Sequence, residues 1–156
     1  MPSEFLTKAG HRKLEEELEY LRTVKRKEVA ERLHEAAESS LGEFVEDPEF
    51  EAAKNEQSFV EGRIRELELL LANAKVITKR RKKNGTVEIG STVVIKEGRR
   101  KPEEYLIVGA AEANPREGKI SHESPLGSAL MGAKEGEKVE VDAPSGSFSV
   151  KIMEVK

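Results

Sequence analysis

Residues 48–74 decide the first half of the fold, and they read PEFEAAKNEQSFVEGRIRELELLLANA. Mostly apolar residues recur in this stretch at spacings that alternate between four and three. The stripe consists of Ala53, Gln57, Val60, Ile64, Leu67, Leu71 and Ala74. Such an alternation is typical of the seam of a coiled coil. With Asp47 as cap and Pro48 in the first turn, the stretch predicts a helix about 40 Å long at ~1.5 Å per residue.

A preceding helix is expected to pack against this one. Thr7 can cap a helix that starts near Lys8, and an apolar stripe follows, interrupted by a polar patch at residues 23–27. Its members are Leu14, Leu18, Leu21, Leu33 and Ala36. The turn around Gly42 then reverses the chain. Residues 1–76 are therefore predicted to form an antiparallel helical hairpin, a coiled coil.

The pattern changes after Asn73, where a basic linker at residues 79–85 precedes short alternating or β-branched runs separated by glycines. These runs predict strands at residues 86–89, 91–96, 104–108, 139–141 and 148–155. Residues 124–131 predict one short helix, with Ser124 as its cap and Pro125 at its first position. The predicted fold class is α+β, with a hairpin over residues 1–76 and a small β-rich domain over residues 77–156.

The predicted hairpin turn, Gly42-Glu43-Phe44-Val45-Glu46-Asp47-Pro48-Glu49, is acidic. Five carboxylates fall within nine residues, namely Glu43, Glu46, Asp47, Glu49 and Glu51. Their mutual repulsion brings no folding benefit, whereas a hard cation such as Mg²⁺ prefers carboxylate oxygens. The turn therefore fits either a solvated loop or a site that helps to hold Mg²⁺.

Charge is distributed unevenly along the chain, whose 156 residues carry a net charge of −3. Residues 1–76 hold 12 basic and 18 acidic residues, whereas residues 77–156 hold 15 and 12. This asymmetry suggests two parts with different partners. The positive excess of the second part is too small to predict tight, non-specific DNA binding.

Composition also limits the kinds of site and location. The absence of cysteine excludes disulfides, thiolate metal sites and a cysteine nucleophile. His11, His34 and His122 are isolated and show no metal-binding spacing. No apolar stretch approaches the ~20 residues of a membrane span, and no secretory signal is visible at the N-terminus. We therefore expect a cytoplasmic protein without a membrane partner.

Six short motifs, in chain order, support a resemblance to a known family. They are Leu6-Thr7-Lys8-Ala9-Gly10, Leu14-Glu15-Glu16-Glu17-Leu18, the acidic turn through Phe50, Ala52-Ala53-Lys54-Asn55-Glu56-Gln57, Glu61-Gly62-Arg63-Ile64 and Ser124-Pro125-Leu126-Gly127. Each is weak alone, but together they are specific and span nearly the whole chain. On these motifs the chain resembles the bacterial Gre transcript-cleavage factors, closer to the GreA branch than to the GreB branch.

The resemblance implies both a fold and a function. It implies that the C-terminal domain has an FK506-binding-protein-like (FKBP-like) fold and docks at the rim of the secondary channel of bacterial RNA polymerase. The coiled coil would enter the channel and bring two tip acids to the active site, beside the nascent RNA 3′ end. The polymerase then cleaves the backtracked RNA and resumes synthesis. The factor would be monomeric and not itself an enzyme.

Glu43 and Glu46 are the catalytic residues and metal ligands that the resemblance implies. They would help to hold a Mg²⁺ ion jointly with the polymerase active site, without binding it stably alone. The usual tip of the family is Gly-Asp-Leu-x-Glu-Asn-x-Glu-Tyr, so Glu43, Asp47 and Phe50 replace Asp, Asn and Tyr here, while Glu46 matches. The longer side chain of Glu43 has more rotamer freedom to lose, which leaves the cleavage efficiency open.

Other positions have a functional and a structural interpretation. Lys54 occupies a basic position that in the family lies near the RNA 3′ end, but a solvent-facing lysine fits equally. Phe44 is expected to contact the channel, whereas Phe50 fits a hydrophobic clasp between the arms. Ser124 and Pro125 are expected at the polymerase contact, although helix capping alone accounts for Ser124. The basic run at residues 79–83 fits a solvated linker or a contact with nucleic acid or polymerase.

Three alternative functions remain from the sequence. A prolyl isomerase is disfavoured because residues 77–156 contain only Tyr105 and Phe148 as aromatics, too few for a proline pocket. A channel-binding inhibitor of RNA polymerase would use the same hairpin without productive cleavage, and the altered tip keeps this interpretation open. A chaperone or generic coiled-coil adaptor is the third.

Overall fold

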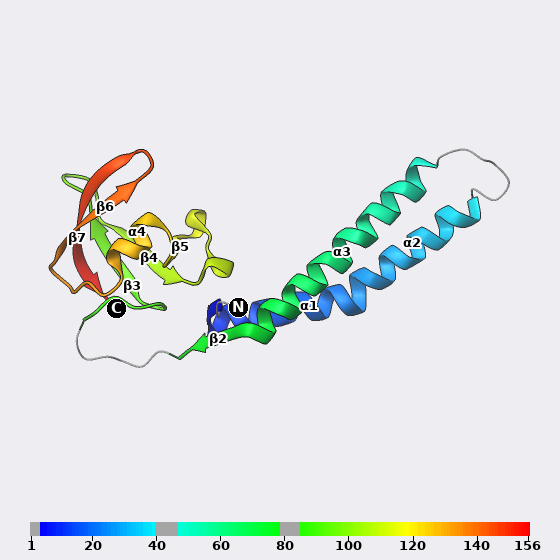
Figure 1. The fold of residues 1–156 in the computed structure, drawn as a ribbon, viewed down its shortest axis with the longest axis horizontal. Helices are drawn as coiled ribbons and strands as arrows, with labels where there is room; N and C mark the ends of the chain where they lie inside the picture. Colours follow the sequence, from blue (N-terminus) through cyan, green and yellow to red (C-terminus); the bar gives the residue numbers. More distant parts are fainter. Residues whose placement is uncertain (1–3, 40–46, 79–84) are drawn as a thin grey trace. The chain divides into compact units, whose positions relative to one another are not determined.

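A computed structural model describes residues 4–39, 47–78 and 85–156 (Figure 1). The chain combines a long helical region with a curled β-sheet. It separates into two compact units, one formed by Arg12–Asn73 and the other by Met1–His11 together with Ala74–Lys156. The described residues 4–11 thus group with the C-terminal unit, and the boundary expected between residues 76 and 77 stays a prediction.

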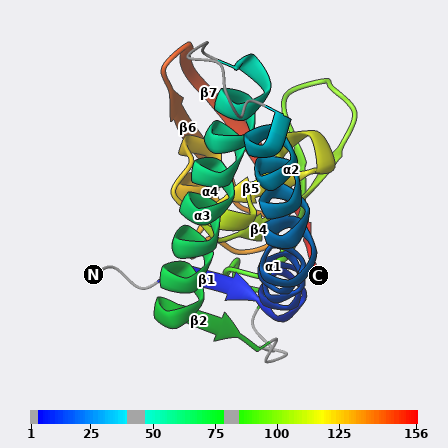
Figure 2. The same ribbon diagram turned by 90° about the vertical axis from the view of Figure 1, so that its right-hand side faces the viewer.

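The helical unit is the expected antiparallel hairpin. Its first arm consists of α1 (Lys8–Tyr20), η1 (Leu21–Lys25) and α2 (Arg26–Ser39), and its second arm is α3 (Pro48–Asn73). Helices α2 and α3 lie side by side in both views (Figures 1 and 2). Arg22 pairs with Glu68 and Arg26 with Glu61, so that residue numbers rise along one arm as they fall along the other.

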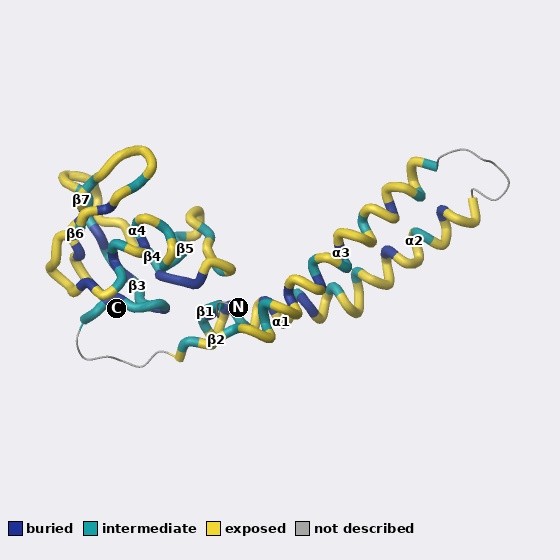
Figure 3. The backbone as a smooth tube through the Cα atoms, in the orientation of Figure 1, coloured by how far each residue is buried: buried dark blue, intermediate teal, exposed yellow. Residues whose placement is uncertain are grey.

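Small and branched apolar residues form the seam between the arms. Figure 3 shows short buried segments, in dark blue, along both arms. The buried seam residues are Leu14, Leu18, Val29, Ala36, Ala53, Val60, Ile64 and Leu67. The prediction is wrong at Gln57, which is exposed, because the partly buried Glu56 takes that place. Glu56 is bound by both Lys25 and Arg32 of the facing arm. Ala74, the last member of the predicted stripe, lies in a strand instead of the helix.

Residues Leu21–Lys25 form a π-helical turn inside the first arm. Between Leu21 and Val29 the spacing of the stripe is one residue longer than an alternation of four and three allows. A π-turn takes up one extra residue without breaking the helix. The turn therefore keeps Val29 and Ala36 on the same face as Leu14 and Leu18, and it explains the polar interruption seen in the sequence.

The predicted caps at both helix starts are confirmed. The Thr7 hydroxyl accepts a hydrogen bond of 3.0 Å from the backbone N–H of Gly10. The Asp47 carboxylate accepts one of 3.0 Å from the N–H of Glu49. Each bond satisfies a donor that the first turn of a helix leaves without an internal partner.

Where the structure describes it, the C-terminal unit contains two sheets. Strands β1 (Glu4–Thr7) and β2 (Ala74–Ile77) form a parallel pair that the sequence did not predict. The larger sheet has the order β5-β4-β3-β7-β6, in which only the β4–β5 pair is parallel. Its strands are β3 (Thr92–Lys96), β4 (Glu103–Val108), β5 (Lys119–Ser121), β6 (Lys138–Ala143) and β7 (Gly146–Val155). Short 3₁₀ turns, η2 (Ala110–Glu112) and η3 (Pro115–Glu117), connect β4 to β5.

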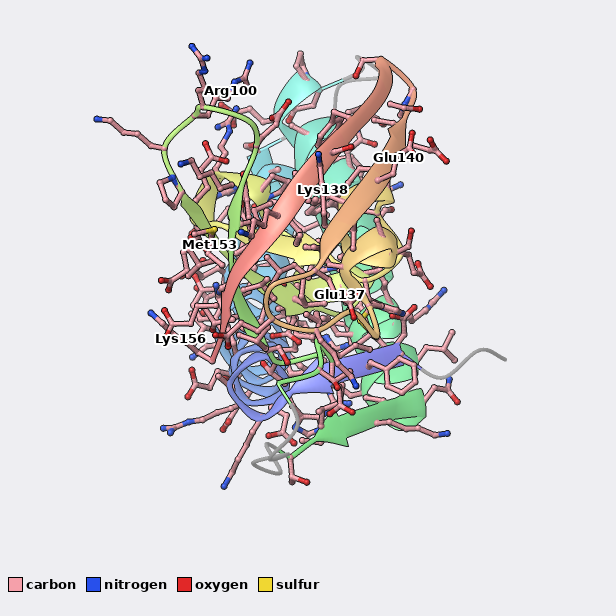
Figure 4. The ribbon with its side chains drawn as sticks, turned by 90° about the vertical axis from the view of Figure 1, so that its left-hand side faces the viewer. Arg100, Glu137, Lys138, Glu140, Met153 and Lys156 are labelled. Atoms are coloured by element: carbon pink, nitrogen blue, oxygen red, sulfur yellow. The ribbon has the colours of Figure 1, made fainter. Side chains whose placement is uncertain are left out.

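One face of the larger sheet forms the core of this unit together with α4 (Pro125–Leu130). Ile107, Leu130, Val141 and Ile152 are fully buried there. Alternate residues of the strands are exposed, and Figure 4 labels Lys138 and Glu140 of β6 among them. The strand predicted at residues 86–89 is wrong. Val87 is buried, but its backbone bonds to residues 132 and 133 after α4 and not to a neighbouring strand.

Candidate functional site

Three predicted site residues, Glu43, Glu46 and Phe44, lie outside the described residues. The structure describes the arms on either side of them, up to Ser39 in α2 and from Asp47 onward. At the start of α3, Glu49 and Glu51 are exposed, in keeping with an acidic end of the hairpin. Among the residues that the structure describes, no group of three or more His, Asp or Glu side chains could hold a metal ion.

Ion pairs across the seam hold the two arms in register. Lys25 Nζ lies 2.9 Å from Glu56, Arg26 Nε 2.7 Å from Glu61, and Arg63 Nε 2.8 Å from Glu17. Arg22 with Glu68 and Arg32 with Glu56 also pair across the seam. Exposed pairs of this kind each contribute little, but together they fix which residues face each other along arms with a narrow seam.

The ion pairs shift the titration of their members. Hydrogen bonding from Lys25, assisted by the Arg32 charge, lowers the pKa of Glu56 below its usual value. Hydrogen bonding from Arg26 likewise lowers the pKa of Glu61. The pKa of Arg63 is raised, chiefly by its hydrogen bonds to Glu17. All of these groups therefore stay charged throughout the neutral range.

Lys54 and Phe50 are brought together on the first turns of α3. The ammonium of Lys54 lies 4.9 Å from the centre of the Phe50 ring. Lys54 is exposed and Phe50 is partly buried. The two residues are four positions apart, a spacing that places them on one face of a helix. The role of Phe50 as a clasp between the arms stays a prediction, while its contact with Lys54 was not foreseen, although the spacing offered the signal.

Ser124 and Pro125 lie together at the start of α4, as predicted. The Ser124 hydroxyl accepts a hydrogen bond of 3.0 Å from Gly127 N–H and donates one of 2.6 Å to the Ser121 carbonyl. Its one donor hydrogen and one of its acceptor positions are thus used to shape the turn. Pro125 is exposed whereas Ser124 is partly buried, so Pro125 is the more accessible member of this pair.

Comparisons with known proteins cover both parts of the chain. Residues 4–76 match the family model described as "Transcription elongation factor, N-terminal", and residues 82–156 match "Transcription elongation factor, GreA/GreB, C-term". The chain belongs to the GreA/GreB family of transcription elongation factors. Within the described residues of this GreA/GreB family member, no helix is long and apolar enough to cross a membrane.

Relatives within the GreA/GreB family align over nearly the full chain. Transcription elongation factor GreA of Caldanaerobacter subterraneus is 51% identical, over 97% of this chain and 96% of the relative. GreA of Clostridium acetobutylicum is 49% identical, over 97% and 95%. Among solved structures, GreA factor homolog 1 of Thermus thermophilus is 31% identical, covers 99% of both chains and has a TM-score of 0.45.

Proposed function

We propose that this chain is a transcription elongation factor that binds bacterial RNA polymerase in its secondary channel. There it stimulates the polymerase's own cleavage of backtracked RNA 3′ ends and so relieves arrest. The observation that carries the proposal is the match of both halves to GreA/GreB family models, with relatives near 50% identity that bear the name elongation factor GreA. The factor supplies side chains to the polymerase and is not itself the enzyme.

The length and narrowness of the hairpin support this role. Helix α3 contains 26 residues, which corresponds to about 39 Å at a rise of ~1.5 Å per residue. Cross-arm ion pairs and a continuous seam hold its partner arm alongside. A two-helix rod of this length is narrow and stiff, so it can carry a few side chains deep into a channel while the other unit stays outside.

Glu43 and Glu46 are the residues that would contribute carboxylates to a Mg²⁺ ion shared with the polymerase. The donor set fits that ion, because Mg²⁺ typically takes one or two protein carboxylates and fills its other positions with water and phosphate oxygens. When bound, the ion supplies water activation and stabilises charge on the leaving oxygen. The chain's own contribution is to present the two carboxylates at the end of the hairpin.

The C-terminal unit is proposed to dock on the polymerase and to have an FKBP-like fold. Its curled five-stranded sheet with α4 packed on one face is compatible with that fold. The exposed Pro125, held at the start of α4 by the Ser124 cap, is the proposed contact residue on this unit.

A cleavage assay on a stalled, backtracked elongation complex tests the proposal. The unaltered protein is expected to accelerate the release of the RNA 3′ fragment. Glu46→Ala is expected to bind polymerase normally but to lose most of the stimulation, and raised Mg²⁺ should restore part of it by mass action. Glu43→Ala should act in the same direction, whereas Glu43→Asp should keep or raise activity. Unchanged stimulation by the double Glu43→Ala, Glu46→Ala protein would exclude the carboxylate mechanism.

Channel-binding inhibition is the second candidate function. The observation that favours it is the replacement of the family's usual tip residues by Glu43, Asp47 and Phe50. The same assay separates the two candidates, because an inhibitor would slow the polymerase's intrinsic cleavage below the rate measured without any factor.

A further inference from the structure

Lys54 is the only lysine or arginine between Arg32 and Arg63, a stretch that also holds nine aspartates and glutamates. A lone cation in such surroundings is expected to pair with a carboxylate. Glu51, one helical turn before Lys54, has a suitable spacing. Within the described residues, however, Lys54 forms no ion pair, and its ammonium lies over the Phe50 ring instead.

Other cations of the hairpin are used differently. Arg22, Lys25, Arg26, Arg32 and Arg63 all bridge to glutamates of the opposite arm. Those pairs neutralise charge and tie the arms together. The contact of Lys54 does neither of these, because both of its members belong to α3 and the ring carries no net charge. Its effect is to restrict where the ammonium can go.

A cation–π contact holds an ammonium without consuming its hydrogen-bond donors. The attraction comes from the electron-rich face of the ring, so the N–H groups that point away from it stay available to a second partner. Phe50 is partly buried while Lys54 is exposed, which means that the ring is the fixed member and the lysine the oriented one. The result is a directed positive charge that pairs with no carboxylate of the described residues, on the helix that Asp47 caps and about two turns after it.

We propose that Phe50 is a positioning residue that holds the Lys54 ammonium ready for a phosphate oxygen of the RNA 3′ end. The inference rests on the proposed function and extends it to a residue that does not touch the reacting atoms. An acidic tip repels the RNA backbone that it has to approach, and a cation fixed beside the tip offsets that repulsion. A freely rotating lysine would do so less well, because binding would cost its rotamer freedom.

The test uses the unaltered protein and five variants in the backtracked-complex cleavage assay. Phe50→Leu keeps an apolar side chain but removes the ring, Phe50→Tyr keeps the ring, and Lys54→Ala and the double Phe50→Leu, Lys54→Ala complete a cycle. Phe59→Leu is the matched control, since Phe59 is 76% exposed on the same helix. Both the maximal cleavage rate and the half-saturating factor concentration are measured.

Phe50→Leu is expected to lower the maximal rate roughly two- to five-fold, the range that corresponds to an exposed cation–π contact, with little change in half-saturation. Phe50→Tyr and Phe59→Leu should match the unaltered protein. In the Lys54→Ala background, Phe50→Leu should have no further effect. Thermal melting of the helices should be the same in all variants, because the contact lies within α3 and leucine or tyrosine keeps a large apolar side chain at position 50.

Three outcomes overturn the inference while leaving the proposed function intact. An equal loss from Phe50→Leu with and without Lys54 would assign Phe50 a packing role. A higher half-saturating concentration at an unchanged maximal rate would show that Lys54 faces an acidic group of the polymerase. A full rate for Phe50→Leu would show that no positioning is needed. If the unaltered protein gives no stimulation, the proposed function fails instead, and the ring-current shift of the Lys54 side-chain protons still reports by NMR whether Phe50 orients the lysine.

Discussion

Thr7 shows how a local signal and a distant partner combine at one residue. Its hydroxyl caps α1 by accepting a hydrogen bond from Gly10 N–H, and it donates a hydrogen bond of 2.6 Å to one carboxylate oxygen of Glu112. The other carboxylate oxygen of Glu112 accepts a hydrogen bond of 2.7 Å from Thr7 N–H. A carboxylate is well placed there, since the N-terminus of a helix carries partial positive charge. A Cβ on Gly10 would lie 1.8 Å from that carboxylate, so a larger residue at this position would displace the Glu112 side chain from Thr7.

A close approach of the backbone accounts for Gly127, the glycine of the Ser-Pro-Leu-Gly motif. A Cβ at this position would lie 1.9 Å from the Ser121 carbonyl oxygen. Gly127→Ala is therefore expected to displace α4 and to destabilise the C-terminal unit by about 1–3 kcal/mol, the usual cost of overpacking. Gly62→Ala is the control, because a Cβ there meets nothing within 4 Å and alanine favours a helix interior by about 0.5–1 kcal/mol. Calorimetry should show the two changes with opposite sign; a neutral Gly127→Ala would contradict the close approach.

At the scale of single elements, the π-turn at Leu21–Lys25 makes a prediction about chain length. Deletion of Thr23 is expected to replace the π-turn by regular helix and to leave the seam aligned, because Val29 and Ala36 then return to an unbroken spacing of four and three. The melting temperature measured by circular dichroism should stay the same or rise.

Deletion of Glu31 serves as the matched control for the π-turn. It shortens the same arm by one residue but misplaces either Val29 or Ala36, both buried on the seam. A lower melting temperature is expected for this variant. Equal destabilisation by the two deletions would show that the π-turn does not absorb an extra residue.

Acid should weaken the hairpin through its cross-arm pairs. The pKa values of Glu56 and Glu61 are lowered in the folded state, so the unfolded chain binds more protons as the pH falls. Their contribution is present above the unfolded value near 4.5 and is lost as the pH falls through the lower folded values. The melting temperature of the hairpin is expected to decline below about pH 5, and less steeply in the double Glu56→Gln, Glu61→Gln protein. An identical decline in both proteins would assign the acid sensitivity to other groups.

The elements that the sequence predicts well are those decided by neighbours in the chain. Caps at Thr7, Asp47 and Ser124 depend on residues two or three positions away, and all three are confirmed. Gln57 was misassigned because two spacings fit between Ala53 and Val60, and the choice of Glu56 depends on cations of the other arm. The β1–β2 pair joins residues about seventy positions apart, which no local pattern reports.

At the scale of the whole molecule, the two parts of the chain differ in charge and are proposed to differ in task. Residues 1–76 are acidic and residues 77–156 carry a positive excess. In the proposed function the hairpin supplies chemistry, while the C-terminal unit supplies affinity for the polymerase. Glu43 and Glu46 belong to neither apolar stripe of the sequence, and Pro125 lies on the other unit. The two properties are therefore expected to respond to different substitutions.

Pro125→Asp and Glu46→Ala should separate affinity from chemistry. Aspartate is favoured in the first turn of a helix, so α4 should persist. The substitution removes the exposed proline contact, and its negative charge opposes the positive excess by which this unit is proposed to attract the polymerase. Affinity for polymerase is expected to fall about tenfold or more, the scale of an interface hot spot, while cleavage at saturating factor recovers. Glu46→Ala should show the reverse. Its affinity should stay within about twofold, because docking is proposed to belong to the C-terminal unit, and saturation should not restore its stimulation. Competition binding and cleavage titrations on the same elongation complex measure both quantities. If Pro125→Asp binds normally while the tip variant loses affinity, docking belongs to the hairpin and the division of tasks is wrong.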